Sequence, residues 1–91
     1  MSTIIVGRPE SSKNSQSITK IINYFEENNF EVISGKTKDI INKNIFINLQ
    51  ISGLLLIENK TNQIHSQNLS TIDFFKQVRK KNIPLLAFGT F

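Results

Sequence analysis

The sequence predicts a single α/β domain over residues 1–91, and two features of the chain support that prediction. The first is the apolar run Gly53–Ile57, which ends on Glu58. Strands that are buried on both faces have such unbroken runs, and this one is too short for a buried helix. The second feature is the alternation of short β-branched runs with amphipathic segments, which favours a parallel sheet whose strands are joined by helices.

The first half of the chain predicts two strands around one helix. Thr3–Val6 is a β-branched apolar run, and a polar loop with glycine and proline follows it. A helix is expected from Ser15 to about Asn29, because apolar residues recur there at i, i+3, i+4 and i+7. These residues are Ile18, Ile21, Ile22 and Phe25. Phe30–Ile33 then predicts a strand near the sheet edge that stops at Ser34-Gly35.

The second half predicts two further helices and a last strand. Thr37 is expected to cap a helix that carries Asp39 in its first turn. The inner face of that helix is expected to hold Ile40, Ile41 and Ile45. A third helix over residues 70–81 is expected to start with a capping box from Ser70 to Asp73. Its predicted buried stripe is Ile72, Phe75 and Val78. Ile83–Phe88 follows as a strand, with its proline at the start, where proline is tolerated.

Four strands that alternate with three helices imply right-handed crossovers and a three-layer, flavodoxin- and receiver-like sheet. The expected strand order is 2-1-3-4, truncated after the fourth strand. Ligands of such sheets bind beyond the carboxyl ends of the strands, at the switch point between strands one and three. The switch-point crevice is therefore expected to be lined by Gly7, Arg8, Pro9, Glu58 and Asn59.

The composition narrows the possible partners. The formal net charge is +4, but the cations are scattered apart from Lys76, Arg79, Lys80 and Lys81. We expect these four at a solvated helix end and not in a nucleic-acid site, because no aromatic residue is interleaved with them. No membrane span and no signal peptide is visible, which predicts a cytoplasmic protein. The absence of cysteine excludes disulfides, thiolate nucleophiles and Cys-ligated metals.

The switch-point residues do not match a known catalytic site. A phosphoaccepting receiver needs an acidic pair after strand one and an aspartate after strand three, where this chain has Gly7-Arg8 and Glu58-Asn59. One carboxylate beside an arginine is a poor magnesium site, so Glu58 is expected to pair with Arg8 or to cap a loop. The loop after Gly7 lacks the spacing of a phosphate-binding loop. His65 is the only histidine and is expected to be an ordinary loop residue. The sequence predicts no catalytic, cofactor-binding or metal-binding residue.

Three segments resemble the N-terminal "wing" domain of the bacterial inducible ornithine/lysine/arginine decarboxylases. They are residues 21–32, Ile51–Glu58 and Asn82–Thr90, the last of which is similar to the family's Pro-Leu-x-Ala-Phe strand. The resemblance implies a receiver-like domain that is not phosphorylated and precedes a large pyridoxal-phosphate region. It also implies contacts between subunits of a homo-oligomer and no cofactor within the domain itself. The charge distribution and the short apolar runs predict neither nucleic acid nor membrane as a partner.

This chain departs from the family at two places. Glu58-Asn59-Lys60 replaces an acidic-aromatic-acidic end of the third strand, and the family's last strand and helix are missing beyond Phe91. The Schiff-base lysine belongs to the catalytic region, which this chain does not contain. The alternative function is a degenerate receiver that acts by protein contact, and an independent enzyme or flavin-binding protein is the third possibility.

The expected end at the fourth strand predicts self-association. In a complete domain of this type, a terminal helix covers one face of the third and fourth strands. Without that helix, the apolar face and the edge of the fourth strand would be open, and both invite pairing. The predicted result is a two-fold dimer. The interface candidates are Leu85, Leu86, Phe88 and Phe91.

Overall fold

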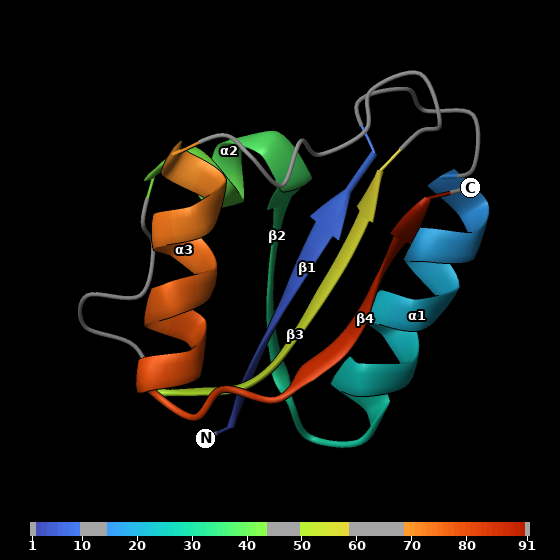
Figure 1. Ribbon diagram of the computed structural model, residues 1–91. Coiled ribbons are helices and arrows are strands. Elements are labelled where there is room, and N and C mark those ends of the chain that lie inside the picture. Colours follow the sequence, from blue (N-terminus) through green and yellow to red (C-terminus); the bar gives the residue numbers. More distant parts are fainter. Residues whose placement is uncertain (1, 10–14, 44–49, 59–68, 91) are drawn as a thin grey trace.

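The computed structural model describes residues 2–9, 15–43, 50–58 and 69–90. Strands and helices alternate, and the four strands form one parallel sheet in the order β2-β1-β3-β4 (Figure 1). The elements are β1 (Thr3–Arg8), α1 (Ser15–Glu27), β2 (Glu31–Lys36), α2 (Thr37–Lys43), β3 (Ile51–Glu58), α3 (Leu69–Lys80) and β4 (Leu85–Thr90). The predicted α/β class and strand order are confirmed.

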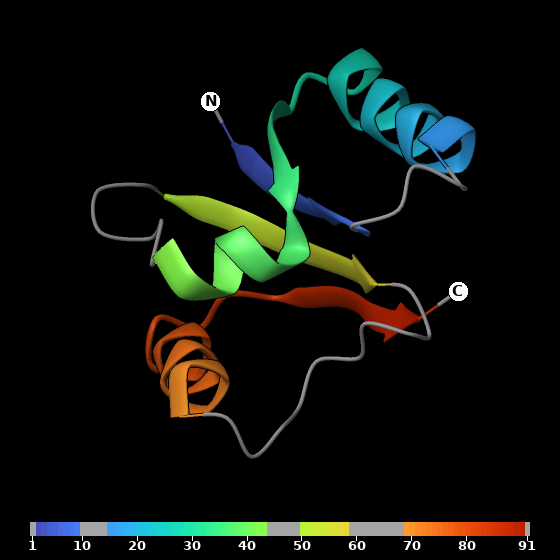
Figure 2. The same cartoon turned by 90° about the horizontal axis from the view of Figure 1, so that it is seen from above.

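The sheet is the middle of three layers. Figure 2 shows α1 on one side of the sheet and α2 and α3 on the other. Successive strand residues point to opposite faces, so β1 and β3 supply both cores. Ile4, Val6 and Leu55 pack with Ile18 on the α1 side, whereas Ile5 packs on the α2 and α3 side. This two-sided burial explains why the central strands are continuous apolar runs.

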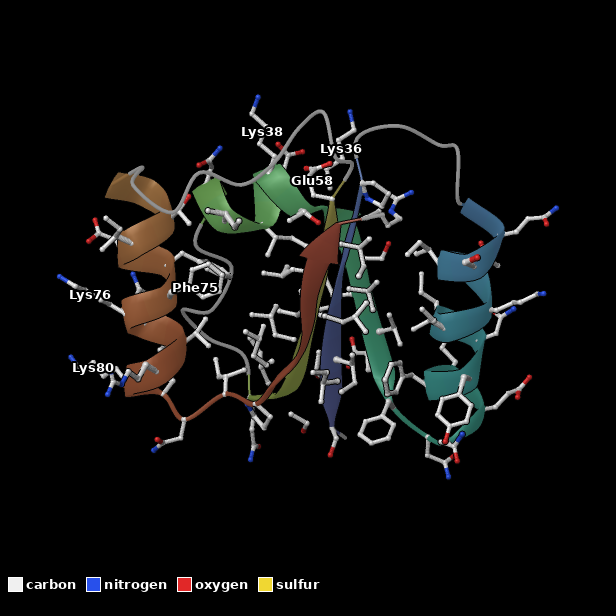
Figure 3. The ribbon with its side chains drawn as sticks, turned by 45° about the vertical axis from the view of Figure 1, so that its right-hand side comes forward. Lys36, Lys38, Glu58, Phe75, Lys76 and Lys80 are labelled. Carbon is white, nitrogen blue, oxygen red and sulfur yellow. The ribbon has the colours of Figure 1, made fainter. Side chains whose placement is uncertain are left out.

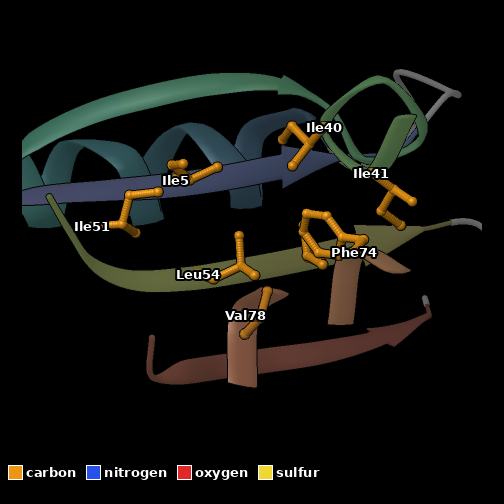
Figure 4. Packing of buried hydrophobic residues seen from close by; sticks show 8 residues of the cluster. Ile5, Ile40, Ile41, Ile51, Leu54, Phe74 and Val78 are labelled. Carbon is orange, nitrogen blue, oxygen red and sulfur yellow. The ribbon is translucent and has the colours of Figure 1, made fainter. Parts of the chain in front are cut away.

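The larger core lies between the sheet and the helices α2 and α3 (Figure 4). Its buried members are Ile5, Ile40, Ile41, Ile51, Leu54, Leu56, Phe74 and Val78. Ile40 and Ile41 come from α2, as the sequence predicted, and Ile45 lies outside the described residues. Burial of each large aliphatic side chain contributes about 1.5–3 kcal/mol, which makes this cluster the main source of stability.

The buried stripe of α3 differs from the predicted one. Thr71, Phe74 and Val78 are buried, whereas Ile72 and Phe75 are half-buried. Val78 is buried as predicted, but Thr71 and Phe74 take the places expected of Ile72 and Phe75, so the buried face is turned by less than the roughly 100° between successive residues. Phe74 takes the central position, and Phe75 packs edge-on against it, with ring centroids 5.2 Å apart. Phe75 covers the rim of the core and does not form its centre.

All four strands differ from their predicted limits. β1 continues past Val6 to Arg8, and β3 already begins at Ile51, before Gly53. β2 continues through Gly35 to Lys36, because Gly35 pairs with Gly7 and Lys36 with Arg8 of β1. The strand then passes into α2 without a loop. β4 begins at Leu85 and not at Ile83, because Ile83 belongs to the motif that ends α3.

The helices α1 and α3 end in the same motif, in which an asparagine adopts a left-handed conformation. The φ angles are 67° at Asn29 and 54° at Asn82. After α1, the N–H of Phe30 donates to the carbonyl oxygen of Phe25 and that of Asn29 to Glu26. This pair of hydrogen bonds defines a Schellman motif. The rings of Phe25 and Phe30 meet edge to face at 5.7 Å, which supplies the apolar contact typical of the motif.

None of the helices in the described part of the chain is long and apolar enough to cross a membrane.

Candidate functional site

The switch point lies where β1 and β3 run side by side and their crossovers leave in opposite directions along the sheet. Gly7 is buried in β1 and pairs with Leu56 of β3, while Arg8 is exposed at the strand end. Glu58 ends β3 with 3% of its surface exposed. The fold thus brings Gly7 and Glu58 onto neighbouring strands. Asn59, the last of the five predicted crevice residues, lies outside the described residues.

Thr37 occupies the space beside Gly7. A Cβ added at Gly7 would lie 2.5 Å from the Thr37 Oγ1 and 3.1 Å from its Cα. Thr37 has 0% of its surface exposed, and its hydroxyl donates a hydrogen bond to the backbone carbonyl oxygen of Ile57. The first turn of α2 therefore packs directly on β1 and β3, and it does so because Gly7 has no side chain.

This packing decides what the crevice can bind. A phosphate cradle needs a glycine whose backbone a ligand can approach closely. Here the chain's own threonine makes that approach to Gly7. The rest of the loop that the sequence analysis tested for anion binding, residues 10–14, lies outside the described residues. The sequence predicted Thr37 only as a helix cap, and its contact with β3 was missed.

Cations surround the carboxyl end of the sheet. Figure 3 shows Glu58 at the same end of the molecule as Lys36 and Lys38. Arg8 and Lys36 are direct partners on neighbouring strands, and both are exposed. Within residues 2–9, 15–43, 50–58 and 69–90, no three His, Asp or Glu side chains gather in a way that could hold a metal ion. A buried glutamate beside exposed cations does not offer the clustered carboxylate oxygens that magnesium needs. The pairing of Glu58 with Arg8 stays a prediction.

The two aspartates with predicted helix roles behave differently. Asp39 lies in the first turn of α2, as expected. Asp73 does not lie in the first turn of α3, because the helix already begins at Leu69. The predicted capping box from Ser70 to Asp73 is therefore wrong about the position of Asp73. His65 lies outside the described residues.

The cationic end of α3 has the geometry of a solvated helix end. Lys76, Arg79, Lys80 and Lys81 are all exposed, and Arg79 and Lys80 lie in the last turn. Figure 3 shows Lys76 and Lys80 pointing away from the sheet. Cations at this position interact favourably with the helix dipole, which gives the cluster a structural role.

The apolar side chain of Leu86 lies exposed over β3 on the α1 side of the sheet. In Figure 2, α1 lies over β1 and β2, and no other described helix covers that side. Leu86 is 47% exposed although its side chain reaches back across β3. A Cβ added at Gly53 would lie 2.7 Å from the Leu86 Cδ1 and 3.0 Å from the Ile4 Cδ1. Gly53 thus makes room for Leu86, a role that the sequence analysis did not recognise when it treated Ser52-Gly53 as a strand boundary.

The four interface candidates fall in or near β4. Leu85 is 45% exposed and Leu86 is the exposed residue described above. Phe88 pairs with Leu56 through the backbone, and its side chain lies outside the described part of the structure, as does the whole of Phe91.

Comparisons of the chain with models of protein families, with curated proteins and with solved structures find no match.

Proposed function

We propose that this chain is a cytoplasmic, non-catalytic assembly domain. It is the N-terminal domain of a pyridoxal-phosphate-dependent ornithine/lysine/arginine decarboxylase and mediates contacts between subunits. One contrast carries the proposal: Thr37 packs against Gly7 beside the switch point, while the apolar side chain of Leu86 stays 47% exposed on the α1 side. A domain that is packed beside its switch point and exposes an apolar side chain on a sheet face is suited to bind protein.

The chemistry of the crevice supports a role without catalysis. Phosphoryl transfer to a receiver needs magnesium held by clustered carboxylates and an accessible acceptor. The carboxylate of Glu58 is buried, and Gly7-Arg8 takes the place of the acidic pair. Pyridoxal phosphate would be held by the lysine of the catalytic region, so this domain needs no cofactor of its own.

A degenerate receiver that regulates a partner by contact is the second candidate function. Its support is the strand order β2-β1-β3-β4 together with Glu58 at the end of β3, where a receiver carries its acceptor. The coding sequence downstream of Phe91 separates the two candidates. A region with a pyridoxal-phosphate lysine supports the decarboxylase, and a DNA-binding or kinase module supports the receiver.

The absence of catalysis is tested on the protein itself. The chain is incubated with magnesium and a small phosphodonor, and its intact mass is measured. The expected result is an unchanged mass, and no saturable absorbance on addition of flavin or pyridoxal phosphate. A stable, magnesium-dependent gain of one phosphate that Glu58→Gln abolishes would overturn the proposal, as would a yellow colour that persists through purification.

A further inference from the structure

We draw no further inference here: the strongest candidate, the exposed side chain of Leu86 in β4 on the α1 side of the sheet, carries none because nothing in the described part of the structure shows what covers it.

Discussion

The Thr37 hydroxyl donates a hydrogen bond to the backbone carbonyl oxygen of Ile57, which fastens the first turn of α2 to the end of β3. Thr37 is fully buried, and β2 passes into α2 at this residue without a loop. The bond therefore holds the first turn of α2 against the sheet next to the switch point, where Thr37 also packs on Gly7.

Replacement of Thr37 by valine should destabilise the protein by about 1–2 kcal/mol. Valine keeps the shape of the side chain but removes the donor to the Ile57 carbonyl oxygen. The control is Thr37→Ser, which keeps the hydroxyl and loses only a methyl group. Urea unfolding monitored by circular dichroism gives both values. Equal stability of wild type and Thr37→Val would show that the hydrogen bond contributes nothing net.

Addition of a methyl group at Gly7 should be more damaging than the same addition at Gly35. At Gly7 the new Cβ would lie 2.5 Å from the Thr37 Oγ1 and 2.8 Å from the Leu56 Cδ2, so both neighbours must move. Overpacking of this kind costs about 1–3 kcal/mol. At Gly35 the nearest atom is the Ile40 Cγ1 at 3.8 Å, an ordinary contact.

Gly7→Ala and Gly35→Ala are compared in the same unfolding assay. Gly35→Ala should change the free energy of unfolding by less than about 1 kcal/mol in either direction, because alanine restricts the unfolded chain without a clash. A tolerated alanine at Gly7 would mean that the space beside it is open, and the claim that Thr37 packs directly against Gly7 would fail.

The sequence was informative where local pattern and burial agree. The apolar runs in β1 and β3 and the helical period of α1 predicted those elements, because burial on two faces or on one stripe leaves a clear signature. The contacts that define the site leave no such signature. The roles of Gly7 and Gly53 depend on side chains from distant segments, Thr37 and Leu86, which approach only in the fold. The turned face of α3 has the same cause, since either Phe74 or Phe75 fits a helical stripe and the packing selects Phe74.

Replacement of Asn82 by glycine should stabilise the protein, and replacement by alanine should destabilise it. Asn82 has a φ of 54°, and the N–H of Ile83 donates to the carbonyl oxygen of Val78 across it. Glycine adopts this conformation without strain, whereas a Cβ raises its energy by about 1–2 kcal/mol, which asparagine partly offsets by local hydrogen bonding. The expected spread between the two variants is about 1 kcal/mol in thermal or urea unfolding. Asn29 has a φ of 67°, so its glycine variant should likewise be more stable than its alanine variant. These two variants test the same argument independently.

Leu86→Lys should weaken self-association by at least about tenfold, or 1.4 kcal/mol. Leu86 is 47% exposed on the α1 side of the sheet, so a lysine there would place a charge in any subunit contact that buries this side chain. The matched control is Tyr24→Lys, which changes the 62% exposed Tyr24 of α1 by the same residue type.

Sedimentation velocity over a range of concentrations measures the dissociation constants of wild type and of both variants, and thermal unfolding at low concentration checks that the monomers remain folded. We expect Tyr24→Lys to associate like the wild type, apart from the small effect of one added charge. Loss of association in both variants would point to net charge as the cause. An unchanged dissociation constant in Leu86→Lys would mean that the interface does not include Leu86. The lysine stem of Leu86→Lys can still lie across Gly53, so a loss of dimer without a loss of monomer stability assigns the effect to the surface itself.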